Sequence, residues 1–458
     1  MKKEEKRDYR PKVHFTPPAM WINDPNGMVY VDGVYHLFYQ HYPEDTVWGP
    51  MHWGHAISGD LLHWDHLPIA LYPDELGYIF SGSCVYDYQN TSGLGAEGKA
   101  PLVALYTSHD GTTQTEHQSM AYSTDYVHFE KYRKNPVISN PGIKDFRDPK
   151  VFRNSELDCW SMVLAATDRV NFYCSRDLKS WEKTGEFLIG HNGIKGICEC
   201  PDCFPVKTEE GIKWILIISM IIETENKMAN VHKTQYFIGT FDGRTFIEAE
   251  KAEGPLWLNY GPDHYAGVTF QNMDRPVLMG WANNWAYGGA VPTEGYRGQM
   301  SLASEISLKK TPLGYRAAFR PLGLEQLRGK GVLAADRTEL ATQSFGLEAE
   351  GSGQGRIILS NAIDEELIIE ITGEEIIVDR TKAGRKDFHE KYGLPEFCRV
   401  SAARYQKGDY RLELIFDVSL LELFAEDGLI PVTMSVYPER PYETLHIEGE
   451  MKAYIYPL

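Results

Sequence analysis

The sequence predicts an all-β protein, a five-bladed β-propeller followed by a C-terminal β-sandwich, and three observations support this fold class. Short segments that alternate apolar and polar residues recur along the chain, for example at 34–40 and 102–107, with Gly, Pro, Asn and Asp between them. A Ser-x-Asp motif recurs among the first 250 residues. A second series of alternating segments follows a change in composition near residue 320. No long amphipathic helix is predicted in the first 300 residues.

The Ser-x-Asp motif is the evidence for propeller blades. Residues 58–64, 123–129 and 175–181 share the pattern Ser-x-Asp-x-x-x-aromatic, and residues 240–246 form a fainter fourth copy. The copies start 52 to 65 residues apart, and each follows a strand-like segment. A strand-turn-aromatic unit at this spacing is typical of propeller blades, and about 300 residues accommodate five of them. The alternative is chance, because Ser-x-Asp turns are common.

The change near residue 320 predicts the domain boundary. We expect the propeller, with the catalytic residues, at 1–322, a linker at 323–338 and the sandwich at 339–458. The third part contains short alternating segments at 356–359, 367–371, 411–416, 420–424 and 451–456, and this spacing is typical of a β-sandwich. It has few candidate catalytic residues, so an accessory role is expected for it.

Composition excludes several classes of function. The 458 residues include 46 Lys+Arg and 64 Asp+Glu, a formal net charge of −18, which disfavours nucleic acid or an anionic membrane as partner. The longest apolar run, 214–222, is far shorter than the roughly 20 residues of a membrane span and predicts a buried strand. The first ten residues are charged and lack the apolar core of a secretion signal. With an odd count of seven cysteines, these features predict a reducing, cytoplasmic location.

Three acidic residues lie in unusual local contexts. Asp24 lies in Trp-Ile-Asn-Asp-Pro-Asn-Gly, Asp148 in Phe-Arg-Asp-Pro, and Glu199 in Glu-Cys-Pro-Asp. A proline follows each acid within two residues, so each acid is predicted where a regular β-ladder breaks off. Because the innermost strands of a propeller line its axis, acids from three blades would converge in one funnel. The alternative for each acid alone is an ordinary turn residue.

Paired carboxylates suit glycoside hydrolysis. One carboxylate attacks the sugar or activates water, while the other protonates the leaving oxygen. The two groups need environments that separate their pKa values, because one must be ionised while the other holds a proton.

These segments resemble the three signature motifs of the invertase and levanase family, glycoside hydrolase family 32. Further segments match the family in order: residues 38–40, 48–55, 80–83, 280–285 and 421–424. The resemblance covers nearly the whole chain. It implies a five-bladed propeller with a β-sandwich, and retaining hydrolysis of terminal, non-reducing β-D-fructofuranosyl residues.

The resemblance also implies roles for individual residues. Asp24 would be the nucleophile and Glu199 the general acid and base, while Asp148, with Arg147, would bind fructose hydroxyls and stabilise the transition state. The residues expected to bind the terminal fructose are Asn23, Gln40, Trp48, Phe80, Ser81, Arg147 and Trp285. No cofactor and no metal are expected.

The residues around the motifs are most similar to those of the levanase and exo-inulinase branch, so we expect short fructooligosaccharides and sucrose as substrates. The main alternative is a sucrose-6-phosphate hydrolase, although no basic cluster for a phosphate is evident. Fructosyl transfer and a catalytically silent fructan-binding protein are further alternatives. The sequence predicts neither the linkage preference nor the oligomeric state.

Three departures from the family pattern concern substrate choice. Cys198 precedes the acid/base where the family usually has Trp, and its smaller side chain is expected to open the site beside Glu199. His264 stands where Phe is usual, and Ala303-Ser304 where Pro-Arg is usual. Three thiols, Cys198, Cys200 and Cys203, with His191 also match a zinc site, but packed free thiols are the preferred interpretation.

Overall fold

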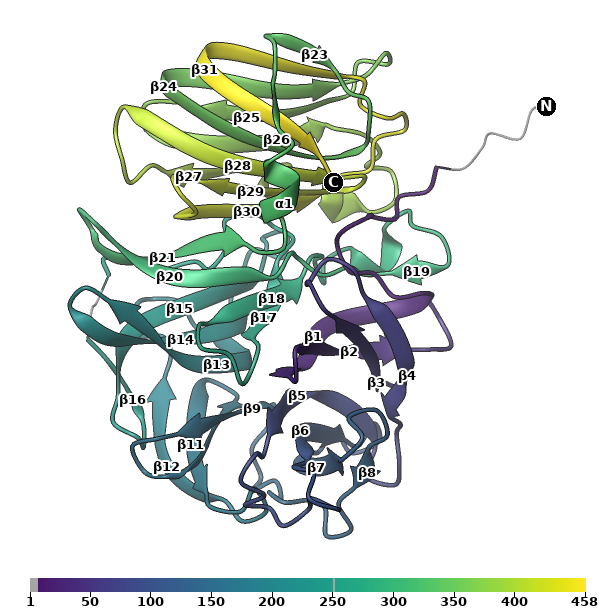
Figure 1. Ribbon diagram of the computed structural model, residues 1–458, viewed down its shortest axis with the longest axis vertical. Coiled ribbons are helices and arrows are strands. Elements are labelled where there is room, and N and C mark those ends of the chain that lie inside the picture. The colour runs from purple at the N-terminus through teal and green to yellow at the C-terminus, as the bar shows by residue number, and fades with distance from the viewer. Residues whose placement is uncertain (1–6, 250–251) are drawn as a thin grey trace.

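The protein has two β-domains that follow one another along its long axis (Figure 1). This computed structural model describes residues 7–249 and 252–458. The first domain is a propeller of five antiparallel blades, and the second is a sheet domain built from the C-terminal part of the chain. The predicted fold class is confirmed.

The blades follow the sequence order, and each runs outward from the axis. Blade 1 contains β1 (Met20–Val31), β2 (Val34–Tyr42), β3 (His52–Ser58) and β4 (Asp65–Leu71). Blade 2 contains β5 (Tyr78–Tyr86), β6 (Leu102–His109), β7 (Glu116–Ser123) and β8 (Glu130–Lys131). Blade 3 contains β9 (Phe146–Asn154), β10 (Cys159–Ala166), β11 (Arg169–Ser175) and β12 (Glu182–Leu188). Blade 4 contains β13 (Gly196–Thr208), β14 (Gly211–Ile222), β15 (His232–Phe241) and β16 (Phe246–Glu248). Blade 5 contains β17 (Tyr265–Thr269), β18 (Val277–Trp281), β20 (Ser304–Thr311) and β21 (Gly314–Pro321).

The Ser-x-Asp motif is the turn between the third and fourth strands of a blade. In blade 1, Leu61 N donates to Ser58 Oγ at 2.8 Å, and His63 N donates to Asp60 Oδ1 at 2.8 Å. The second copy repeats both bonds, and in the third copy the backbone amides again donate to the same two side chains. The repeat therefore marks blades, because the same two side chains satisfy the same turn in each.

The ring closes between segments far apart in sequence. The short strand β19 (Tyr296–Arg297) pairs in parallel with the start of β1. The first strands of neighbouring blades contact one another around the axis. The apolar run at 214–222 lies in β14, between β13 and β15, as its composition predicts. No helix in the described ranges is long and apolar enough to cross a membrane.

The C-terminal domain is one ten-stranded sheet that folds over a single core. Its strands are β22 (Val332–Leu333), β23 (Arg337–Glu339), β24 (Ser344–Ser360), β25 (Glu366–Ile371), β26 (Glu375–Lys382), β27 (Arg399–Ala403), β28 (Asp409–Asp417), β29 (Leu420–Ala425), β30 (Ile430–Ser435) and β31 (Thr444–Pro457). The first half of β24 pairs with β28 and the second half with β25, while β31 runs along both halves. One hydrophobic cluster contains residues from both halves, so the two layers of the predicted sandwich share these two strands.

Helices are short and lie between strands. They are η1 (Gly288–Ala290), α1 (Glu325–Arg328), η2 (Glu390–Gly393) and α2 (Pro395–Cys398). The segment expected to be a linker, 323–338, contains α1, then β22 and the first residues of β23, which both pair with β31. Most of this segment is therefore part of the C-terminal domain rather than a connection between domains.

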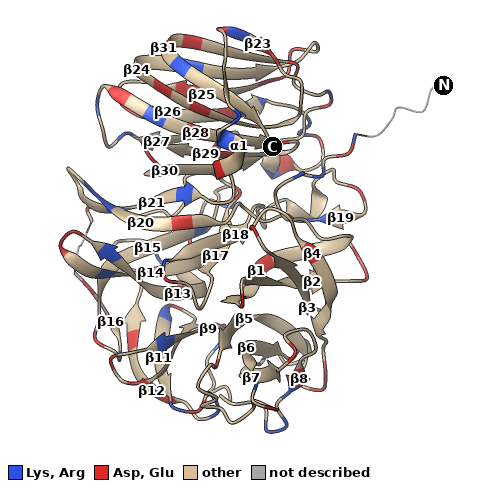
Figure 2. Cartoon of the chain, viewed as in Figure 1, with Lys and Arg blue, Asp and Glu red and all other residues tan. Residues whose placement is uncertain are grey.

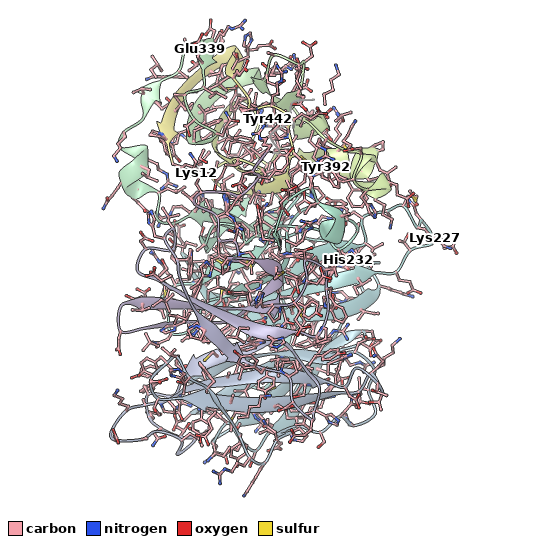
Figure 3. The ribbon with its side chains drawn as sticks, turned by 90° about the vertical axis from the view of Figure 1, so that its right-hand side faces the viewer. Lys12, Lys227, His232, Glu339, Tyr392 and Tyr442 are labelled. Carbon is pink, nitrogen blue, oxygen red and sulfur yellow. The ribbon has the colours of Figure 1, made fainter. Side chains whose placement is uncertain are left out.

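The N-terminal segment joins the two domains. The backbone amides of Lys12, Val13 and His14 donate to the carboxylate of Asp417 in β28, at 2.9 to 3.1 Å. Figure 3 shows Lys12 at the level where the domains meet. Acidic and basic residues are interspersed over both domains (Figure 2).

Candidate active site

One cavity of about 510 Å³ lies at the end of the propeller axis and collects every site residue predicted from the sequence. The ten are Asn23, Asp24, Gln40, Trp48, Phe80, Ser81, Arg147, Asp148, Glu199 and Trp285. Five more line the same walls: His109, Gln114, Glu116, Lys144 and Asp145. Residues from all five blades or their connections thus meet at one place.

A β-bulge in the innermost strand of each blade builds this cavity. The pairing register shifts in all five of these strands: β1 between Ile22 and Pro25, β5 between Ile79 and Gly82, β9 opposite Val163 to Ala165, β13 between Glu199 and Asp202, and β17 between Tyr265 and Val268. A bulge leaves its extra residues unpaired and re-aims their side chains. The prolines beside the three acids predict this interruption, because proline cannot donate to the ladder.

Asp24 is held by three donors. Ser81 Oγ donates to Asp24 Oδ2 at 2.6 Å, Asn23 Nδ2 donates to Oδ1 at 3.0 Å, and the Cys200 thiol lies 3.5 Å from Oδ2. Burial raises the pKa of this carboxyl above its usual value, and the three donors oppose that shift. The donors also fix the direction in which the carboxylate faces.

Asp148 lies on a strained backbone and has fewer partners. Its φ of +65° is in the left-handed region, which a non-glycine residue rarely adopts. Its carboxylate accepts Cys200 N at 2.9 Å and lies 3.6 Å from the Cys200 thiol. Burial raises its pKa to about 8, with Glu199 and Asp24 adding to the shift and Arg147 opposing it. Burial thus favours the protonated form of Asp148.

Glu199 has two strong partners. Arg147 Nη2 donates to Oε1 at 3.0 Å, and the Tyr265 hydroxyl donates to Oε2 at 2.5 Å. Burial still raises the pKa of Glu199, against the effect of both donors. Asp145 and Glu116 also contact the Arg147 guanidinium, so its charge is divided among three carboxylates.

Aromatic and amide side chains form the cavity walls. Trp48 is 44% exposed at the mouth of the cavity. Its ring meets the Phe80 ring edge-on, with the two ring centroids 6.1 Å apart. Trp285, which also lines the cavity, packs against Trp21 and Trp281. Gln40 is fixed by bonds from its Nε2 to Asn26 Oδ1 at 2.8 Å and Ile79 O at 3.0 Å.

Sequence reasoning did not identify the residues that support the acids. Cys200 lies inside the third motif, but its thiol was considered only as a metal ligand or free thiol, and it contacts both Asp24 and Asp148. Tyr265 stands in no motif, although its place in the first strand of blade 5 would have directed it to the axis. Glu116 and His109 belong to β7 and β6, and no local pattern identifies them.

Cys198 does not open the site, which corrects the expectation from its small side chain. It is fully buried in a hydrophobic cluster of blades 3 and 4 with Val163, Ala165 and Ile218. Successive strand residues face opposite sides, so Cys198 points into the core when Glu199 points toward the axis. The other two departures, His264 and Ala303-Ser304, are buried and do not line the cavity.

The cysteines do not form a metal centre. Cys203 packs in the same cluster as Cys198, whereas Cys200 faces the acids and His191 contacts Glu248. Within residues 7–249 and 252–458, no group of three or more His, Cys, Asp or Glu is arranged to hold a metal ion.

Comparison with known proteins gives a consistent result. Residues 14–316 match the family described as "Glycosyl hydrolases family 32 N-terminal domain", and residues 305–453 match "Glycosyl hydrolases family 32 C terminal". A levanase of Bacillus subtilis is 38% identical over 96% of this chain and 68% of its own length. An extracellular exo-inulinase of Aspergillus awamori is 32% identical over 94% of this chain and 90% of its own. The crystal structure of exo-inulinase from A. awamori superposes with a TM-score of 0.89 at 29% identity, covering 99% of this chain and 98% of that one.

Proposed function

The chain belongs to glycosyl hydrolase family 32, and from this premise we propose that it is a retaining exo-β-fructofuranosidase that acts on short fructooligosaccharides and sucrose. The observation that carries the proposal is the meeting of Asp24, Asp148 and Glu199 in one cavity at the propeller axis. Relatives named levanase, exo-inulinase and invertase, the last 36% identical and from Schizosaccharomyces pombe, support a fructoside substrate. A yeast fructofuranosidase structure complexed with fructosylnystose, with a TM-score of 0.88 at 27% identity, supports it further.

Asp24 is the nucleophile. Its donors leave the carboxylate aimed into the cavity and favour its ionised form. One oxygen attacks the anomeric carbon of the terminal fructose, the bond from that carbon to the glycosidic oxygen breaks, and a covalent fructosyl ester forms on Asp24.

Glu199 is the acid and then the base. Burial raises its pKa and so favours the protonated form, which gives its proton to the departing glycosidic oxygen. The resulting carboxylate removes a proton from water, the hydroxide so formed attacks the anomeric carbon, and fructose leaves Asp24 with its configuration retained.

Asp148 binds the sugar and stabilises the transition state. A pKa of about 8 favours the protonated carboxyl, which can donate to one fructose hydroxyl and accept from another. Its single backbone donor, Cys200 N, leaves this capacity free for substrate.

The cavity favours the end of a neutral chain. Trp48 and Trp285 offer aromatic surfaces to the cavity, and Asn23 and Gln40 contribute amide groups for hydroxyls. A fructosyl unit at the chain end would enter first, with the leaving unit toward the exposed Trp48.

A sucrose-6-phosphate hydrolase is the second candidate, and Lys144 is the observation that favours it. Lys144 is exposed at the cavity wall. The other cation of the wall, Arg147, is already engaged by carboxylates. A single lysine is a weak phosphate site. Because sucrose has no phosphate for Lys144 to bind, Lys144→Ala should change KM for sucrose less than threefold. A loss of more than tenfold in kcat/KM for the phosphorylated sugar alone would favour the second candidate.

We propose that the protein works in a reducing compartment such as the cytoplasm. All seven cysteines are free, and six of them are buried. Cell fractionation with an antibody against the chain tests this, and recovery from the culture medium would contradict it.

Release of fructose from sucrose, sucrose-6-phosphate, 1-kestose, levanbiose and inulin, measured side by side by chromatography, tests the function. We expect the fastest release from short β-fructosides, with β-fructofuranose as the first product by NMR. Strong preference for the phosphorylated sugar would identify the second candidate, and transfer products would identify a fructosyltransferase. No release from any of them would indicate a silent binding protein.

A further inference from the structure

Glu116 is a buried carboxylate in the cavity wall to which the proposed reaction assigns no step. It begins β7, is 4% exposed and pairs across the sheet with His109 of β6. Its Oε2 accepts the backbone N–H of Phe146 at 2.7 Å, at the start of the strand that carries Arg147 and Asp148. The carboxylate therefore lies where blade 2 meets blade 3.

The first contact of Glu116 leads to the acid/base. Arg147 Nη1 lies 3.1 Å from Glu116 Oε1 and 3.3 Å from Oε2, while Nη2 of the same guanidinium donates to Glu199. The planar guanidinium has a fixed fork of donors, so a carboxylate that holds one end sets the direction of the other. Glu116 thus fixes the approach of Arg147 to Glu199.

The second contact of Glu116 leads to the sugar-binding wall. His109 Nδ1 lies 3.3 Å from Glu116 Oε1. The His109 ring stacks on Phe80, with centroids 4.1 Å apart and planes 9° from parallel, and Phe80 meets Trp48 at the mouth. The orientation of Phe80 is therefore coupled to Glu116 through one stacked ring.

We propose that Glu116 is a positioning residue of this site: its carboxylate holds Arg147 against Glu199 and, through His109, holds Phe80 against the fructosyl unit. This inference rests on the proposed function. It gives one side chain two separable effects, one on the proton held by Glu199 and one on substrate binding.

Charge explains the first effect. The ionisable groups that face Glu199 are Arg147, Tyr265, Asp24, Asp148 and Cys200, and those that face Glu116 are Arg147 and His109. The Glu116 carboxylate shares the Arg147 guanidinium with Glu199. Without that competitor, Arg147 would stabilise the Glu199 carboxylate more strongly and lower the pKa of the acid.

Glu116→Gln tests the proposal because it keeps the shape and one acceptor but removes the charge. The retained acceptor keeps Arg147 in place, and we expect kcat for 1-kestose to fall about tenfold, because the unshared guanidinium charge favours the ionised form of Glu199, which has no proton to donate. The alkaline limb of the kcat profile should move to lower pH by about one unit. Glu116→Asp keeps the charge, so its alkaline limb should lie close to that of the wild type. A purely structural role of Glu116 would not make the position of the limb depend on the charge.

His109→Gln separates the two effects. It leaves the Glu116 charge in place and removes the ring stacked on Phe80, so KM should rise about threefold with the pH limb unmoved. Glu75→Gln, an exposed glutamate ahead of β5, is the matched control and should behave as wild type.

Three outcomes overturn the proposal. The first is a folded Glu116→Gln variant whose kcat and alkaline limb equal those of an active wild type. The second applies if Glu116→Gln does not fold: an unchanged KM in His109→Gln would then overturn the proposal. A wild-type protein that releases no fructose from any substrate would remove the proposed function as well, and that result differs from the first two.

Discussion

Two groups of buried acids lie in this molecule, one at the propeller axis and one between the domains, and they have opposite partners. At the axis, Asp24, Asp148 and Glu199 line one cavity, and among the described residues Arg147 is the cation paired with them, through Glu199. Between the domains, each of these acids contacts a cation: Asp417 and Glu422 share His14, and Arg380 contacts Asp263 at 2.6 Å.

The partners decide the charge state. Asp417 accepts three backbone N–H groups, the Ser344 hydroxyl and a ring nitrogen of His14, and hydrogen bonds of this kind lower its pKa to about 2 although burial opposes them. Asp148 accepts one backbone N–H, and burial raises its pKa to about 8. Full satisfaction makes an acid structural, whereas incomplete satisfaction leaves an acid able to exchange protons and bind sugar.

The largest expected effect comes from neutralising an axial acid. Asp24→Asn and Glu199→Gln should each lower kcat by about 10⁴-fold, because both roles are chemical. Stability should be unchanged or slightly higher, since burial outweighs the donors at both carboxyls and raises their pKa, and an amide avoids that cost of burying a charge. Single-turnover kinetics and thermal unfolding measure the two quantities. Near-wild-type rates in either variant would contradict the mechanism.

The opposite result is expected between the domains. Asp417→Asn leaves His14 and three backbone amides without their anion, and should lower the free energy of unfolding by about 3–5 kcal/mol. The kcat of the folded fraction should stay near wild type, because Asp417 lies outside the cavity. Urea unfolding with active-site titration measures both. Equal stability of Asp417→Asn and wild type would remove the contrast between the two groups.

The dependence of stability on pH also separates the groups. Burial lowers the pKa of His14, but the hydrogen bonds and charges of Asp417 and Glu422 outweigh it and raise the pKa to about 9 from 6.5. Because the folded pKa is the higher one, this stabilisation is complete below about pH 6.5 and is lost as pH rises through 9. Its size is about 3 kcal/mol.

The variant His14→Asn isolates this contribution. Unfolding free energies of wild type and variant, measured from pH 6 to 10, should converge as pH rises. Asp148 also lowers the free energy of unfolding as pH rises to about 8, because its pKa is higher in the folded protein. This decrease is common to wild type and variant and cancels in the difference between them. A constant difference would show that His14 is not charged in the folded protein.

Local patterns predicted more of the fold than of the contacts. The Ser-x-Asp turns identified blades because their hydrogen bonds lie within six residues, and the prolines beside Asp24, Asp148 and Glu199 identified interrupted ladders. Tyr265 and Glu116 contact the site only through pairings between blades, over 66 and 31 residues, which no local pattern records. The two short strands in the expected linker depend likewise on pairing with β31, more than 100 residues later.

The smallest expected effect concerns Cys198, where facing matters more than proximity in sequence. It is adjacent to Glu199 yet packs in the core of blades 3 and 4, beside Val163 and Met220. Cys198→Ala should cost about 1–2 kcal/mol of stability by leaving a small void, with the ranking of sucrose, 1-kestose and levanbiose unchanged. Cys200→Ala is the matched comparison, because its thiol contacts Asp24 and Asp148 and its loss should alter the pH profile of kcat. A changed substrate ranking in Cys198→Ala with an unchanged profile in Cys200→Ala would mean that alternation along β13 does not separate the core face from the catalytic face.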